Sequence, residues 1–443
     1  MKKKILLRGF SVGLLIISMT TMAQSVGYIV PGVPKPFKFG HVAKNPHIVT
    51  NPHPPRQLYT LQPNDALRYQ QQHNHYQEDL RRVAQQEQLI KDYTAEINKS
   101  RVQYSLPSFS KDVRTSYYHE AYKKLKQMNP DNFSIKDATF IVENAFYDNK
   151  LDSARFNKTI SNISGFIRKA MQNQELDPKS NLSKNLSIYQ FISDTLTVDG
   201  RTHLPYTYDF NDYMGKENWN NMFVSKLLYT GKGQCNSMPR LYLILAEELE
   251  ANSYLALAPN HSFIRFKDGQ GEWHNAELTS GAIMSDMMMF DSGFIKAETI
   301  RNGNYMTART KRQLMSLLLD DLASGYISKF GRDEFVQTVV NSALELDPNG
   351  INPNIHNFNM KLARMTFVAQ QLRAKNPKEL SRHPKALEMY KELALQDMKL
   401  KELGFQEMPK ERYEAWLESL NKEKEKQDQE KYKGLNKAPI IKD

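Results

Sequence analysis

The sequence Gly231-Lys-Gly-Gln-Cys235-Asn-Ser-Met-Pro239-Arg-Leu-Tyr-Leu-Ile-Leu-Ala-Glu-Glu-Leu249 joins a glycine-rich turn, the only cysteine of the 443-residue chain and an apolar run. Proline is tolerated in the first turn of a helix and disfavoured in its interior, so Pro239 predicts that a helix begins close to Cys235. The apolar residues that follow predict that this helix is buried. Because a helix N-terminus favours a thiolate, the position of Cys235 suits a nucleophile.

An antiparallel sheet is predicted directly after this helix. Strands are expected at residues 254–258, at 261–266 (His261-Ser-Phe-Ile-Arg-Phe266) and at 273–278. The pair Asp268-Gly269 predicts a tight turn between the last two strands. A helix followed by an antiparallel sheet is typical of the α+β class, which we predict for residues 205–300.

Cys235, His261 and Glu277 occur in the order nucleophile, base and orienting acid. In a cysteine-dependent enzyme the histidine takes the thiol proton, and the third residue accepts a hydrogen bond from the other ring nitrogen. Asn275 is an alternative third member, because strand alternation puts it on the same face as Glu277. From the sequence alone, Cys235 can also be a small apolar residue packed beneath the helix.

Stabilisation of an oxyanion needs a hydrogen-bond donor close to the nucleophile. The candidates are the backbone N–H of Cys235 and the side-chain amides of Gln234 and Asn221.

These residues resemble the motifs of the papain-like transglutaminase-like superfamily. The matching segments are Gly233-Gln-Cys235, His261 at the start of a strand, and Trp273-His-Asn-Ala-Glu277-Leu-Thr279. The branch that looks most similar is the bacterial one, of the invasion-regulator type, in which a transglutaminase-like core precedes tetratricopeptide (TPR) repeats. The resemblance covers about residues 130–350 and implies a helical subdomain, a helix-on-sheet core and trailing repeats. Glu277 stands where the family usually has aspartate.

The N-terminus has the pattern of a secretory signal peptide at residues 1–23. A basic start, Lys2-Lys3-Lys4, precedes a short apolar run and the small residue Ala23. We therefore expect an exported protein, periplasmic or extracellular, with no membrane span after cleavage. A single cysteine cannot form an internal disulfide, and a lone thiol in an oxidising compartment favours a functional interpretation of Cys235.

Composition divides the rest of the chain into five segments. We expect a Pro-rich linker at 24–62, a long polar helix at 63–110, a helical subdomain at 111–204, a helical region at 310–405 and a charged helical tail at 406–443. Within the helical subdomain, Ser134 is expected to cap one helix, and a further helix is expected at 186–196. Within 310–405, helices are predicted at 314–330, 333–346, 360–374 and 384–403. The ending Ala343-Leu-Glu-Leu-Asp-Pro348 is similar to the end of a TPR repeat.

Several function classes find no support in the sequence. The formal net charge of +11 is scattered, without a basic patch interleaved with aromatic residues, so nucleic-acid binding is not expected. No metal-binding motif occurs, and His73 and His75 do not share a helix face. The methionines of residues 284–289 favour core packing over a copper site. No metal and no cofactor are predicted.

Two functions remain. The first is a thiol hydrolase or acyl-transferase that acts on amide bonds of a peptide, protein or peptidoglycan-like substrate. The second is a non-catalytic scaffold that holds a protein partner through the C-terminal helices, since the branch that the chain resembles includes members without the cysteine. An open cleft at Cys235 would favour the first, and a packed thiol the second.

Overall fold

The computed structural model describes residues 63–405, except positions 101, 213, 294, 296 and 375, and also residues 418 and 422. The predicted signal peptide and linker lie outside the described residues, as does the predicted tail apart from those two positions. The described chain forms two units, residues 63–104 with 370–376, and residues 105–369 with 377–405.

The first unit contains one long polar helix, α2 (Pro63–Ser100). The predicted helix is confirmed, but it ends at Ser100 rather than at residue 110. In the second unit, residues 105–110 are not helical, because Pro107 disfavours helical backbone before it. The N–H groups of Leu106 and Phe109 donate instead to the carboxylates of Glu334 and Asp333.

The second unit begins with the helices α3 (Thr115–Gln127), α4 (Ile135–Phe146), α5 (Ser153–Asn173) and α6 (Asn181–Ser193). As expected, Ser134 caps α4, because its side chain accepts a hydrogen bond from the N–H of Asp137. Asp152 and Ser180 cap α5 and α6 in the same way. The buried faces of these helices share one apolar core with the rest of the unit.

A small hairpin follows α6 where the sequence predicted only a longer helix and a loop. Its strands are β1 (Leu196–Val198) and β2 (Arg201–His203). Asp199 and Gly200 both have positive φ, 50° and 74°. This backbone matches the two-residue turn that joins twisted strands most easily.

The centre of the unit is a helix packed on an antiparallel sheet. A short 3-10 helix (Trp219–Met222) and α7 (Val224–Thr230) precede β4 (Lys232–Gly233), which pairs in parallel with β3 (Thr207–Tyr208). Helix α8 (Ser237–Glu248) is buried along most of its length. The sheet has the order β5 (Tyr254–Ala258), β6 (His261–Lys267), β7 (Trp273–Glu277) and β8 (Ala282–Met284). The α+β class is therefore confirmed.

The methionine-rich segment adds the strand β8 and helix α9 (Asp286–Gly293), which were not predicted. Met289 is buried in a small apolar cluster with Phe263 and Met306, as the packing interpretation expected. Met287 and Met288 are exposed, so that interpretation was wrong for these two residues.

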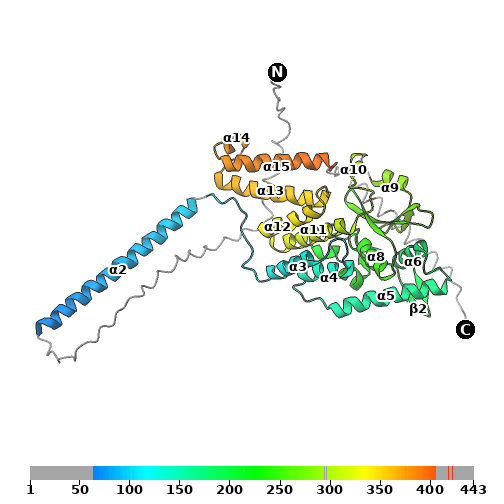
Figure 1. Ribbon diagram of the computed structural model, residues 1–443, viewed down its shortest axis with the longest axis horizontal. Coiled ribbons are helices and arrows are strands. Elements are labelled where there is room, and N and C mark those ends of the chain that lie inside the picture. The colour runs from blue at the N-terminus through cyan, green and yellow to red at the C-terminus, as the bar shows by residue number, and fades with distance from the viewer. Residues whose placement is uncertain are drawn as a thin grey trace, which may run out of the picture. The chain divides into compact units, whose positions relative to one another are not determined.

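The C-terminal part is a row of helices after α10 (Ala297–Arg301). They are α11 (Lys311–Phe330), α12 (Glu334–Leu346), α13 (Ile351–Leu372), α14 (Pro377–Leu380) and α15 (Pro384–Glu402). Helix α13 starts well before the predicted residue 360, because Pro353 lies in its first turn, where proline is tolerated. Hydrogen bonds of Asn357 join α13 to both α12 and α15, and Figure 1 shows these helices side by side.

Among the helices that the structure describes, none combines the length and the apolar composition needed to cross a membrane.

Candidate active site

Cys235 lies in the short loop between β4 and α8, two residues before the helix begins. The backbone leading to it is tightly packed. Gly231 ends α7 with φ 71°, and a Cβ atom at Gly233 would lie only 2.7 Å from the side chain of Met238. Glycine at these two positions therefore lets the chain turn out of α7 and pass close to α8.

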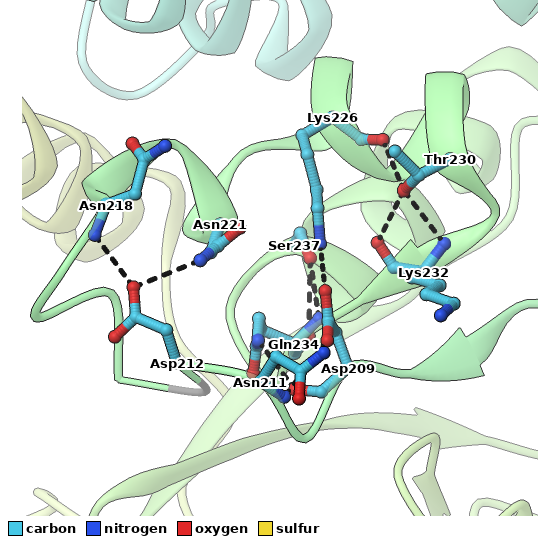
Figure 2. Close-up of polar contacts among 10 residues, drawn as sticks. All are labelled: Asp209, Asn211, Asp212, Asn218, Asn221, Lys226, Thr230, Lys232, Gln234 and Ser237. Atoms are coloured by element: carbon cyan, nitrogen blue, oxygen red, sulfur yellow. Dashed lines mark hydrogen bonds and ion pairs between the residues drawn. The ribbon is translucent and has the colours of Figure 1, made fainter.

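One ion pair and several hydrogen bonds hold the loop that leads to Cys235, as Figure 2 shows. Lys226 forms an ion pair of 2.5 Å with Asp209, and both side chains are largely buried. The side-chain amide of Gln234 donates to the backbone oxygen of Asp209 at 2.8 Å, and its backbone N–H donates to Ser237 Oγ at 2.9 Å. These bonds hold the residue before the thiol in one position.

Two side-chain amides that were expected to stabilise the oxyanion donate hydrogen bonds to other groups. The amide of Gln234 is committed to Asp209, and that of Asn221 donates to the carboxylate of Asp212 at 3.0 Å. Neither residue lines the cavity that Cys235 faces. The structure does not bring these amides to the thiol, because each one donates to an acceptor in the neighbouring loop at residues 209–212. The backbone N–H of Cys235 has no hydrogen-bond acceptor among the described residues, so it remains the candidate donor.

His261 is the first residue of β6 and Glu277 the last of β7, so the sheet brings them together at one end. His261 Nε2 lies 2.5 Å from Glu277 Oε2, and each side chain is 10% exposed. Cys235 lines the same cavity as His261 and contributes to the electrostatics of the imidazole. The sulfur also lies 4.0 Å from the backbone oxygen of Asn260.

The pair His261–Glu277 carries opposite charges. Burial by itself would lower the pKa of His261, but the charge of Glu277, the hydrogen bond that His261 donates to it and the interaction with Cys235 outweigh burial and raise this pKa above its ordinary value. Burial would raise the pKa of Glu277, but the charge of His261 and bonds from His261 and Thr279 hold it below its ordinary value. The Thr279 N–H donates to Glu277 Oε1 at 2.8 Å. The imidazole is therefore positively charged beside the thiol at neutral pH.

Asn275, the alternative third member, belongs to a different network. Its amide donates to Asp286 at 2.8 Å and to the backbone oxygen of Met284 at 3.1 Å. Asp286 in turn pairs with Arg265. Since Asn275 is bound to β8 and α9, it does not orient His261, and the alternative is wrong.

A cavity of about 300 Å³ opens at the thiol. Cys235, His261 and Ser262 line it, and α11 and α13 contribute Asp320, Asp321 and several apolar side chains. Ser262 was not recognised in the sequence. Its hydroxyl donates to the backbone oxygen of Cys235, a contact between residues 27 positions apart that no local pattern signals.

No protein-family model matches the sequence, and no curated protein matches it. Among solved structures, the chain is similar to one described as the crystal structure of menin that reveals the binding site for the Mixed Lineage Leukemia (MLL) protein. That similarity has a TM-score of 0.30 and 11% sequence identity, and it covers 58% of this chain and 67% of menin's. A TM-score this low does not bear on function. Among the described residues, no group of three or more His, Cys, Asp or Glu is arranged to hold a metal ion.

The charges of the pair predict how stability depends on pH. Because the pKa of Glu277 is lowered from 4.5, its ionisation contributes to the free energy of unfolding above that pH, and this contribution is lost in acid. Because the pKa of His261 is raised from 6.5, its contribution is complete below that pH and is lost as the pH rises. We expect Glu277→Gln to lower the free energy of unfolding by about 1–3 kcal/mol near pH 5.5, and by less at about pH 3.5 and pH 9.

The measurement is the thermal unfolding midpoint of both proteins across this pH range. A difference that is flat with pH would show that His261 and Glu277 are not an ion pair.

Proposed function

We propose that this chain is a cysteine-dependent amide hydrolase or acyl-transferase with a transglutaminase-like core and TPR-like C-terminal helices. Its substrate would be a peptide, protein or peptidoglycan-like amide outside the cytoplasm, with export resting on residues 1–23. The observation that carries the proposal is that Cys235 lines one cavity with His261, whose imidazole is paired with the buried carboxylate of Glu277.

The reaction follows from the positions of these groups. The thiolate of Cys235 forms a bond to the carbonyl carbon of the amide. As the C–N bond breaks, His261 gives its proton to the leaving nitrogen, and the acyl group stays on Sγ as a thioester. Water or a second amine then attacks the thioester, His261 takes a proton from it, and the thiolate leaves. Glu277 keeps the imidazole oriented throughout.

The negative oxygen of the tetrahedral intermediate needs a fixed donor. The backbone N–H of Cys235 is suited to this role because it lies just before the N-terminus of α8 and has no other described acceptor. Ser262 holds the carbonyl of the same residue, so it acts as a positioning residue for this N–H.

The accessibility of the thiol supports an enzyme over a scaffold. Cys235 is partly exposed and lines the cavity, whereas a purely structural cysteine would be covered by neighbouring side chains. Binding of a protein partner by the C-terminal helices would be a separate property of the chain.

The reactivity of the thiol tests the proposal. Because the chain has one cysteine, alkylation by iodoacetamide reports on Cys235 alone. At about pH 6.5 we expect native wild type to be alkylated at least about tenfold faster than His261→Ala, since a neighbouring imidazolium favours the thiolate. If the wild type reacts only after denaturation, the thiol is buried and the proposal fails.

A further inference from the structure

The cavity beside Cys235 contains a carboxyl group that has no cationic partner among the described residues. Its lining contains four side chains of the basic and acidic residue types, namely Arg240, His261, Asp320 and Asp321. Arg240 Nη2 binds Asp321 Oδ2 at 2.9 Å, and His261 is paired with Glu277 behind it. Both cations are therefore neutralised by carboxylates other than Asp320.

Asp320 itself is buried and has no hydrogen bond to another described residue. It is 7% exposed, and its Oδ1 is a buried oxygen without a hydrogen-bond partner. The nearest basic group is His356, whose Nε2 lies 3.6 Å from Oδ1 and is also within 3.1 Å of Ser324 Oγ. Burial lowers the pKa of His356 to about 4, so this imidazole is neutral at physiological pH and does not balance the carboxylate.

Such a carboxylate is costly for the folded chain. A buried polar group without a hydrogen bond destabilises a protein by a few kcal/mol, and an unpaired charge costs more. In agreement, burial raises the pKa of Asp320 to about 8, so this carboxyl group is mainly protonated at neutral pH in the empty cavity, and a bound cation would favour its ionised form. Unpaired carboxylates of this kind in a cavity are typical of binding sites that gain their partner from a ligand.

We propose that Asp320 binds a positively charged group of the substrate, a guanidinium or an ammonium, so that the cavity selects peptides with a basic residue close to the amide that Cys235 attacks. This inference rests on the proposed function and names its substrate class. The apolar part of the lining, including Leu257, Tyr305 and Ile355, suits the aliphatic stem of such a side chain. The cation would supply the charge and the donors that Asp320 lacks.

The test compares thiol reagents that differ in charge. Trimethylammonioethyl, sulfonatoethyl and methyl methanethiosulfonate each form a mixed disulfide with Cys235 and release methanesulfinate. The readout is the ratio of cationic to anionic labelling rates, divided by the same ratio for a small thiol in solution. At about pH 9, where Asp320 is ionised, we expect this ratio to be about tenfold higher in the wild type than in Asp320→Asn.

Two more variants keep the result interpretable. Glu272→Gln removes one negative charge from the exposed turn between β6 and β7 and should leave the ratio at the wild-type value. Asp320→Ser removes the same carboxylate with a smaller side chain and should behave like Asp320→Asn. Both Asp320 variants should unfold at a temperature at least as high as the wild type, because they remove a buried carboxyl group that has no hydrogen bond.

The outcomes separate the two proposals. If the neutral methyl reagent labels the wild type only after denaturation, the proposed function fails, and this inference fails with it. If the neutral reagent reacts readily but the ratio is the same in wild type and both Asp320 variants, the inference is overturned and the proposed function stands. A fall in the ratio for Glu272→Gln equal to that for Asp320→Asn also overturns it, since the effect would then come from net charge.

Discussion

Replacing His261 with alanine is expected to slow the acylation of Cys235 by about 10²- to 10⁴-fold, the usual contribution of a positioned acid or base. The imidazole lies between the thiol and the buried carboxylate of Glu277, and no other described residue replaces it in that series. Without it, no neighbouring base takes the proton of the thiol, and the positive charge that favours the thiolate is lost.

The measurement is the release of nitrophenolate from p-nitrophenyl acetate, with the acetyl thioester detected by intact mass. Cys235→Ala gives the background rate. His274→Ala is the matched control, because His274 also pairs with a carboxylate, Asp268, at 2.9 Å, but in the turn of the β6–β7 hairpin. We expect its rate to stay within about twofold of the wild type. Equal losses in both histidine variants would contradict a specific role for His261.

Added hydroxylamine distinguishes the two reaction types. Faster loss of the acetyl group from Cys235 in its presence would indicate that the thioester is open to amines, as acyl transfer requires. The same rate with and without hydroxylamine would favour hydrolysis.

Local patterns predicted the centre of the fold well. Pro239 and the apolar run after it located α8, and the turn Asp268-Gly269 located the strands on either side. Short strands were missed, because three residues such as Leu196–Val198 carry too little periodicity to be distinguished from a helix end. The early start of α13 was missed because Pro353 looks like a helix breaker until its place in the first turn is known.

The sequence predicted the candidate site only for residues that their type and their order along the chain identify. Cys235, His261 and Glu277 stood out through residue type and order, and the structure brings them together. The amides of Gln234 and Asn221 could not be judged from the sequence, because their acceptors lie in a loop at residues 209–212. Asp320 could not be found at all, since the folding of α11 against the core is what places it in the same cavity as the thiol.

Replacing Glu143 with alanine is expected to lower the free energy of unfolding by about 3–5 kcal/mol, the largest stability effect that we predict. Glu143 lies on α4 and is 3% exposed. Its two carboxylate oxygens accept hydrogen bonds from the N–H groups of Val224 and Ser225, at 2.7 and 2.9 Å. These are the first residues of α7, which has no side-chain cap from Phe223. Alanine would leave both buried donors without an acceptor.

Chemical denaturation of the wild type, Glu143→Ala and Glu143→Gln measures this effect. Glutamine keeps one acceptor oxygen, so the decrease in the free energy of unfolding for Glu143→Gln should be intermediate. Glu120→Ala removes an exposed acid from α3 as a control and should cost at most about 1 kcal/mol, because Glu120 forms a surface ion pair with Lys124 and accepts one exposed hydrogen bond from Asn149. A loss for Glu143→Ala as small as that of Glu120→Ala would contradict the capping role.

The pH dependence of the same variants reports how strongly the hydrogen bonds to Glu143 stabilise its carboxylate. Burial raises the pKa of Glu143 from 4.5 to about 7, although the hydrogen bonds from Ser225 and Val224 oppose it. Between these values the folded chain binds more protons than the unfolded chain at this position, so the contribution of Glu143 to stability falls as the pH rises. Glu143→Gln has no proton to lose. We therefore expect the stability difference between wild type and Glu143→Gln to shrink as the pH rises from about 4.5 to 7, and a carboxylate buried without these hydrogen bonds would make it shrink more steeply.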